Sequence, residues 1–105
     1  MSNDGLVARK TFTTLSTDTA AALSTTDIAD STGVVAKKLL ITFETNSIRC
    51  AYGGTTPTTT ATTAIGHLMV SGDSMEIQGA SDVKSLKIIS AVAGAHGRLN
   101  CTVFT

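Results

Sequence analysis

The sequence predicts an all-β protein, an antiparallel β-sandwich or jelly-roll-like barrel of about seven strands with an extended N-terminal arm. Apolar and β-branched residues alternate with polar ones in several short segments, which is the pattern of half-buried strands. Turn signals built around glycine separate these segments about every ten residues. No helical pattern alternates with the strands, so a parallel α/β sheet is not expected.

Chain length and the N-terminal composition divide the sequence into two parts. The 105 residues suit one domain with a single core. The beginning of the chain is polar and contains a glycine, and chain ends stay poorly ordered unless other residues hold them. We therefore expect an N-terminal arm over residues 1–11 and a single β-sandwich domain over residues 12–105. A first strand is expected over residues 10–15, where threonines favour extended backbone.

Residues 16–30 are expected to form an irregular connection with one helical turn. The alanine-rich run at residues 19–23 could form such a turn, with Asp18 as its cap, and residues 24–27 could cap a second short turn. The serines and threonines around it compete for backbone hydrogen bonds and weaken any longer helix. A turn is expected at residues 31–33, where a glycine follows serine and threonine.

A β-hairpin is expected in the middle of the chain. It consists of a long strand over residues 34–44, a tight connection at Thr45 and Asn46, and a return strand over residues 47–52. Alternation places one set of side chains on the inward faces: Leu39, Ile41, Phe43, Ile48, Cys50 and Tyr52. It places another set on the outward faces: Lys38, Leu40, Thr42, Glu44 and Arg49.

The C-terminal half begins with a threonine-rich loop at residues 53–63. Strand-like segments follow it, at residues 65–70, 74–78, 83–92 and 98–104. Turn signals separate them, at residues 71–73, 79–82 and 94–97. In the first of these turns, Gly72 supplies a positive φ and Asp73 supplies a local side-chain hydrogen bond. In the last strand, the inward residues are Leu99, Cys101 and Val103.

The two cysteines, Cys50 and Cys101, each lie within an apolar alternation. We interpret them as buried thiols that act as small hydrophobic side chains. A disulfide between two neighbouring strands is the alternative. Small secreted scaffolds usually contain more cysteines than two.

Composition and charge exclude several classes of function. Eight basic and eight acidic residues give a formal net charge of zero, whereas a nucleic-acid binder needs a basic stripe. Charged residues make up 15% of the chain, below the average of about 25%, which favours a protein that stays in an assembly. No apolar run approaches the ~18 residues of a membrane span, and a signal peptide is not expected, since the first residues lack a basic stretch followed by an apolar run.

No residue pattern indicates catalysis, so we predict no enzyme, no catalytic residue, no cofactor and no metal site. His67 and His96 do not have metal-ligand spacing. The serines and aspartate at residues 71–74 are explained by a tight turn. Glu44 and Glu76 are expected on outward faces, where they are solvated and do not form a pair of catalytic carboxylates.

Seven short motifs follow one another along residues 34–105. They are IRCAYGG (48–54), TPT (56–58), GHL (66–68), SGDS (71–74), IQG (77–79), LKII (86–89) and LNCTVF (99–104). This order resembles the small β-sandwich proteins that decorate or cement the heads of tailed bacteriophages or lie near the head–tail junction. The resemblance implies a homo-oligomer, often a trimer, that binds the lattice of the major capsid protein. It also implies a virion protein that assembles in the host cytoplasm. From the net charge and the lack of a long apolar run, neither nucleic-acid nor membrane partners are expected.

The predicted function is therefore that of a capsid decoration or cement protein, and its interface is expected in the arm and the threonine-rich loop. An arm can add a strand to a neighbour's sheet, while proline and branched threonines lose little entropy when they bind. The predicted interface residues are Leu6, Val7, Lys10, Phe12, Thr56, Pro57 and Thr58.

Two alternatives remain. The protein could be a neck, tail or fibre-base component of the virion. A carbohydrate- or receptor-binding sandwich is disfavoured, because sugar sites present aromatic faces and at least Phe43 and Tyr52 are expected to be internal.

Overall fold

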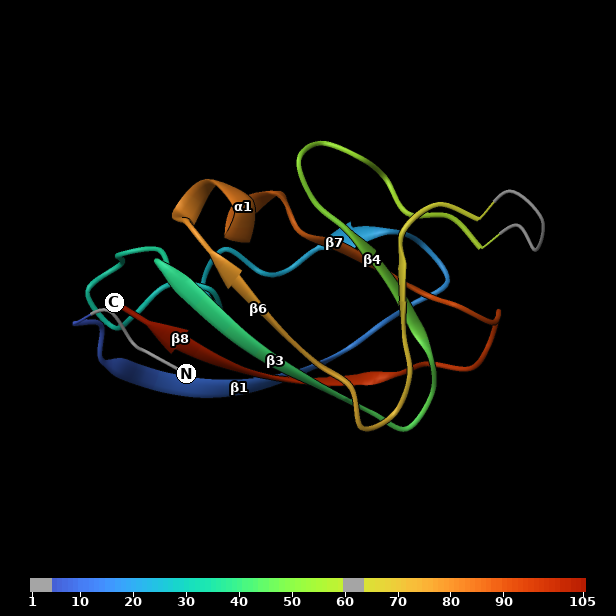
Figure 1. Cartoon of the computed structure of the whole chain (residues 1–105), viewed down its shortest axis with the longest axis horizontal. Helices are drawn as coiled ribbons and strands as arrows, with labels where there is room; N and C mark the ends of the chain where they lie inside the picture. The colour runs from blue at the N-terminus through green and yellow to red at the C-terminus, as the bar shows by residue number, and fades with distance from the viewer. Residues whose placement is uncertain (1–4, 60–63) are drawn as a thin grey trace.

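The computed structural model describes residues 5–59 and 64–105, which form two four-stranded antiparallel sheets (Figure 1). Residues 1–4 of the predicted arm and 60–63 of the predicted loop lie outside the described residues. The elements are β1 (Ala8–Leu15), β2 (Ala21–Ala22), β3 (Lys38–Glu44), β4 (Ile48–Ala51), β5 (His67–Met69), β6 (Ser74–Gln78), α1 (Ala80–Ser85), β7 (Lys87–Ser90) and β8 (Arg98–Phe104).

The strand order is β1-β8-β3-β6 in the first sheet and β2-β7-β4-β5 in the second, and each pairing is antiparallel. The prediction of an all-β fold is therefore confirmed. The described strands do not close into a barrel. Within the same residues, no helix has the length and hydrophobicity needed to cross a membrane.

Both sheets contribute side chains to one hydrophobic core. The predicted inward faces of β3 and β8 are confirmed, since all six of these side chains are almost completely buried: Leu39, Ile41, Phe43, Leu99, Cys101 and Val103. The second sheet contributes Ile48, Cys50 and Ile88 to the same core. Each large side chain buried in this way stabilises the fold by about 1.5–3 kcal/mol, which fixes the register of β3 against β8.

The predicted hairpin of residues 34–52 is wrong. β3 pairs with β6 and β8, whereas β4 pairs with β5 and β7 in the other sheet. The chain crosses between the sheets after β3, where Thr45 adopts a φ of 75°. Strands that face each other across a core show the same alternation as strands paired edge to edge, so the pattern does not distinguish the two arrangements. The first strand of this predicted hairpin, β3, is also shorter than expected. The backbone N–H of Ala36 donates to the carbonyl of Ile28 and not to a neighbouring strand of the sheet.

Lys38 lies on the face of β3 opposite Leu39, as predicted, but it is not solvated, because only 1% of this residue is exposed. Its Nζ lies 3.9 Å from Oε1 of Glu76 and 4.4 Å from the ring centroid of Phe104. In the pairing of β3 with β8, Phe104 lies directly opposite Lys38. A carboxylate and an aromatic face both offset part of the cost of burying an ammonium group. Glu76 is consequently half-buried rather than fully solvated.

The predicted helical turn at residues 19–23 is also wrong. Ala21 and Ala22 form β2 and pair with Ile88 and Lys87 of β7. Asp18 caps no helix, since its Oδ1 accepts a hydrogen bond from the backbone N–H of Gly94. Two residues of strand leave no periodicity to detect, and here tertiary pairing overrides the helix propensity of alanine.

A short helix, α1, stands where a turn and the beginning of a strand were expected. It buries Val83 and is followed directly by the buried Leu86. Gly79, Ser81 and Asp82 are turn residues as well as residues found at helix starts, and six residues are too few to display a helical period. The strand expected over residues 83–92 is therefore limited to β7.

The predicted arm is shorter than 11 residues, because residues 8–11 already belong to β1. This strand pairs with β8 from Ala8 opposite Phe104 to Leu15 opposite Arg98. Just before it, the carbonyl of Val7 accepts a hydrogen bond from the N–H of Thr105. The polar composition of this segment gave no signal for the beginning of the strand. Only alternate residues of β1 are half-buried, and the others face solvent.

The predicted turn at residues 71–73 is confirmed in its details. Gly72 has a φ of 95°, and Oδ2 of Asp73 accepts a hydrogen bond of 2.9 Å from the N–H of Val70. The N–H of Gly72 donates to the carbonyl of Phe43, which ties the turn to the end of β3. This turn also carries the chain from one sheet to the other, from β5 to β6.

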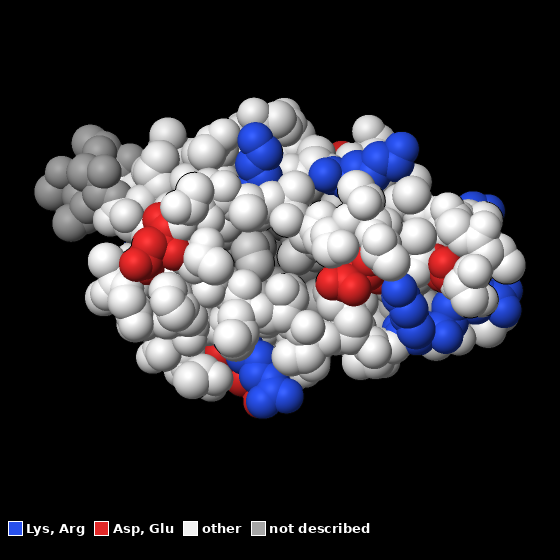
Figure 2. Space-filling view, turned by 180° about the vertical axis from the view of Figure 1, so that it is seen from behind, with Lys and Arg blue, Asp and Glu red and all other residues white. Residues whose placement is uncertain are grey.

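The surface carries few charges. On the face opposite to that of Figure 1, the Lys, Arg, Asp and Glu side chains lie in small groups with wide uncharged areas between them (Figure 2). This distribution agrees with the low charged fraction of the whole chain, 15%. An uncharged surface loses little solvation when another molecule covers it.

Candidate functional site

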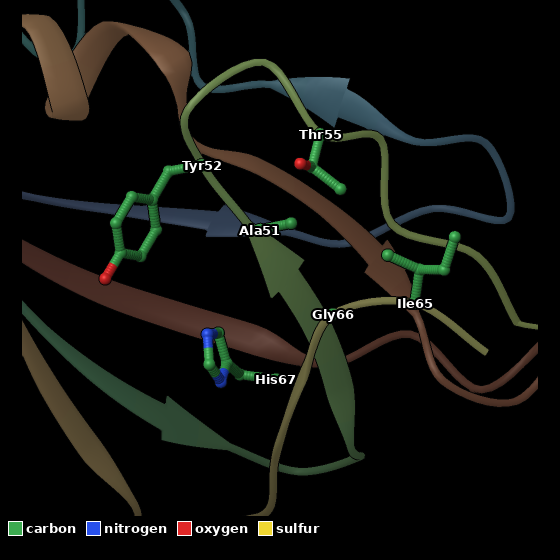
Figure 3. A pocket seen from close by; sticks show the side chains of 6 residues that line it. All are labelled: Ala51, Tyr52, Thr55, Ile65, Gly66 and His67. Atoms are coloured by element: carbon green, nitrogen blue, oxygen red, sulfur yellow. The ribbon is translucent and has the colours of Figure 1, made fainter.

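An open pocket of about 430 Å³ lies beside the end of β4, where the chain leaves the second sheet and later returns to it in β5 (Figure 3). The residues that line it are Ala51, Tyr52, Thr55, Ile65, Gly66 and His67. In this view the rings of Tyr52 and His67 lie together on one side, and Thr55 and Ile65 lie on the other.

The aromatic side of the pocket is formed by Tyr52 and His67. Their ring centroids are 6.4 Å apart with an angle of 27° between the planes, an offset stack. Tyr52 remains 42% exposed, so the prediction that it faces the core is wrong. The inward alternation of Ile48 and Cys50 stops with β4 at Ala51, and Tyr52 no longer follows the pleat.

The floor of the pocket requires a glycine. Gly66 has a φ of 115°, and a Cβ atom there would lie 3.0 Å from the carbonyl oxygen of Cys50 and 3.2 Å from Cβ of Pro57. The carbonyl of Gly66 accepts a hydrogen bond from Nη1 of Arg49. Because backbone, guanidinium and proline all hold this segment, the pocket is formed before any ligand arrives.

The loop that carries the pocket is closed by two hydrogen bonds. The N–H of Thr58 donates to the carbonyl of Ile65, and the N–H of Ile65 donates to Oγ1 of Thr58, each at 3.0 Å. Four large apolar side chains in this region are exposed: Tyr52, Ile65, Leu68 and Val70. The pocket therefore opens onto an apolar part of the surface, next to the short edge strand β5.

The loop residues predicted at an interface have different surroundings. Pro57 is fully buried, so the prediction that it contacts a partner is wrong; it packs beside Gly66 instead. Thr56 is exposed, and its Oγ1 accepts a hydrogen bond from Nζ of Lys87. Thr58 is half-buried and closes the loop as described.

The arm residues predicted at an interface lie elsewhere, along and before β1. Val7 is 50% exposed and Leu6 is half-buried. Phe12 is half-buried and packs against the core of its own domain, so its ring is only partly available to a neighbour. Lys10 donates from Nζ to the carbonyl of Thr26. Of these four residues, Val7 is the most open to a partner.

A chain of polar side chains at the far end of β1 includes the residue types of a catalytic triad, but not its geometry. The hydroxyl of Ser90 lies 3.0 Å from Nδ1 of His96, and the carboxylate of Asp18 lies 3.9 Å from the same nitrogen. A triad needs the acid and the serine on opposite ring nitrogens. Ser90 is also completely buried and hydrogen bonded to the buried Ser16, so no substrate can reach it.

Replacing Ser16 by alanine is expected to lower the free energy of unfolding by about 1–3 kcal/mol. Its hydroxyl accepts a hydrogen bond from the buried N–H of Gly97 and bonds to the hydroxyl of Ser90, and alanine leaves both groups short of a partner. Urea unfolding measures this loss. The exposed Thr17→Ala is the control, with an expected change below about 0.5 kcal/mol. Equal losses in both variants would contradict the structural role of Ser16.

Cys50 and Cys101 are free and buried, which confirms their interpretation as small hydrophobic side chains. Burial raises the pKa of Cys50 to about 11 and that of Cys101 to about 12. Thiols with such pKa values are neutral near pH 7 and are poor nucleophiles and metal ligands. Among the residues that the structure describes, no three His, Cys, Asp or Glu side chains gather closely enough to hold a metal ion.

Fold and site together define an all-β protein of two antiparallel sheets with a small aromatic-walled pocket on its surface. Comparison of the chain with protein-family models, with curated proteins and with solved structures found no match.

Proposed function

We propose that the chain is a structural protein of a bacteriophage virion that decorates the capsid. It acts by binding rather than by catalysis, and its partners are the lattice of the major capsid protein and further copies of itself, in a trimer. It assembles in the host cytoplasm and stabilises the head. The observation that carries this proposal is the long, open edge of the first sheet.

This edge is β1, eight residues long, which pairs with β8 on one side and lies at the margin of its sheet in the described part of the chain. Exposed apolar residues stand at both of its ends, Val7 before it and Leu15 at its last position. Long edge strands offer unpaired backbone groups to an added strand, and proteins that stay monomeric usually block them. In β1 the blocking features, a bulge and two charges, are confined to residues 8–10.

The weakly charged surface supports the same proposal. A protein on a lattice is surrounded by many identical sites, so modest contacts by each copy add up through avidity. Such contacts cover surface that would otherwise favour aggregation of a free, uncharged protein. The resemblance of residues 34–105 to phage head proteins is the reason for proposing that this lattice is formed by the major capsid protein.

The test is binding to phage heads that lack this protein. The double variant Val7→Lys and Leu15→Lys places charges at both ends of the β1 edge, at positions 50% and 59% exposed, and thermal unfolding verifies that the fold is intact. We expect at least a tenfold loss of bound copies. Val92→Lys, on the exposed loop between β7 and β8, is the matched control and should bind normally. Equal occupancy of both variants would overturn the role of β1.

Electron microscopy of labelled particles tests the location. Label over the whole head supports decoration. Label at a single vertex would assign the protein to the neck, tail or fibre base instead.

A further inference from the structure

We propose that the pocket between Tyr52 and Ile65 binds one ring of a neutral saccharide. This inference goes beyond capsid decoration and uses a different part of the molecule. The pocket volume of about 430 Å³ lies within the range of small-molecule sites, and the pocket is open to solvent. A single sugar ring of a longer chain can therefore enter it while the rest of the chain stays outside.

The chemistry of the walls fits a sugar ring. A pyranose has an apolar face of C–H groups and a rim of hydroxyl groups, and an exposed aromatic ring covers such a face well. Tyr52, which is 42% exposed, supplies this ring, and His67 stacks against it. The polar groups around the pocket are the Tyr52 hydroxyl, the His67 ring nitrogens and the Thr55 hydroxyl, which can donate to and accept from sugar hydroxyls.

The charge of the site selects a neutral ligand. None of the six lining residues is Asp, Glu, Lys or Arg, so a phosphate, carboxylate or amine would be bound without a counter-charge. The guanidinium of the neighbouring Arg49 is directed to the carbonyl of Gly66, within the protein. Nucleotides, sialic acids and amino sugars with free amines are therefore disfavoured.

The site is held in shape by groups outside the ring stack. Gly66 brings the backbone against Pro57 and Cys50, and the hydrogen bonds of Thr58 close the loop over Ile65. A preformed site loses little conformational entropy on binding, which matters for the weak contacts that single sugar rings make.

The position of the pocket is compatible with binding of the protein to a capsid. The C-terminus and the beginning of β1 lie at one end of the long axis, whereas the segments that flank residues 60–63 lie at the other (Figure 1). A copy held on a lattice through the β1 edge, which belongs to the first sheet, leaves the pocket beside the second sheet uncovered. The sugar can come from a free saccharide or from a glycan on a cell surface, since both offer the same ring.

The test is a titration of the full chain, labelled for NMR, with glucose, galactose, mannose and N-acetylglucosamine at millimolar concentrations, and with neutral bacterial polysaccharides. We expect shifts confined to residues 51–55 and 65–67. Tyr52→Ala should weaken binding at least tenfold, whereas Tyr52→Phe keeps the ring and should retain most of it. Leu68→Ala, an exposed β5 residue that does not line the pocket, is the matched control and should bind as the wild type.

Binding of the polysaccharides alone supports a surface glycan as the source, and equal binding of monosaccharides supports a free sugar. No shift with any neutral sugar, tighter binding of a charged sugar, or unchanged binding by Tyr52→Ala would overturn the proposal. Thermal unfolding of each variant verifies that the fold is intact. The Val7→Lys and Leu15→Lys double variant should bind sugar normally, which separates this proposal from that of lattice binding.

Discussion

Replacing Gly97 by alanine is expected to lower the free energy of unfolding by about 3 kcal/mol, the upper end of the usual cost of overpacking and a large part of the stability of a domain of this size. Gly97 is buried just before β8, and a Cβ atom there would lie 2.6 Å from Cδ1 of Ile48 and would also meet the carbonyl oxygen of Asn46. The carbonyl oxygen of Asn46 belongs to the backbone and cannot rotate away as a side chain can. Ile48 is completely buried in the core and cannot move aside either. Urea unfolding followed by circular dichroism measures the loss.

Gly94 in the same loop is the matched control. It has a φ of 78°, and a Cβ atom there would meet nothing within 4 Å. Gly94→Ala therefore costs only the strain of a left-handed backbone, about 1–2 kcal/mol. A loss at Gly97 no larger than that at Gly94 would show that the segment between β3 and β4 can move away from β8.

The strands whose partners lie on both sides were the most predictable part of the fold. β3 and β8 are central strands of their sheet, and their inward residues alternate strictly because one face packs on the core. The limits of β8 agree with the sequence prediction of residues 98–104, and Gly97 precedes the strand. Alternation reports burial of one face, and it succeeded where that burial is complete.

Strand pairing could not be predicted in the same way. The connection at Thr45 and Asn46 is as short as a hairpin turn, but it crosses from one sheet to the other. The difference lies in the backbone at Thr45, a residue rarely found at positive φ, and no composition signal announces it. β2 and α1 were missed because two and six residues are too short for a period.

The candidate pocket was missed because Tyr52 continues the apolar alternation of β4. The signal that could have found it is the pair Gly53 and Gly54, both at positive φ, which end the strand immediately after the tyrosine. An aromatic residue at the end of an interrupted strand leaves the pleat and becomes available to solvent. The nearness of His67 depends on the pairing of β4 with β5 across a long loop, which no local pattern contains.

Stability is expected to fall steeply above pH 9, because two buried thiols keep their protons only in the folded protein. Burial raises the pKa of Cys50 to about 11 and that of Cys101 to about 12, and the negative charge of Asp27 adds to the second shift. Unfolding returns both thiols to an ordinary pKa of 9.0. Their contribution is thus complete below pH 9 and is lost as the pH rises toward the folded values, by about 1.4 kcal/mol per pH unit for each thiol.

Urea unfolding of the wild type, Cys50→Ala and Cys101→Ala between pH 7 and pH 11 tests this expectation, with the pH range set by about two units on either side of the ordinary thiol pKa. Each alanine variant starts less stable at pH 7 because it leaves a small cavity. Above pH 9 its stability should nevertheless decline more slowly, by about 1.4 kcal/mol per pH unit. Each variant differs from the wild type only at one thiol, so the difference in slope isolates that thiol. Parallel profiles would mean that solvent reaches the thiols in the folded state, and that the core between the two sheets opens at high pH without unfolding.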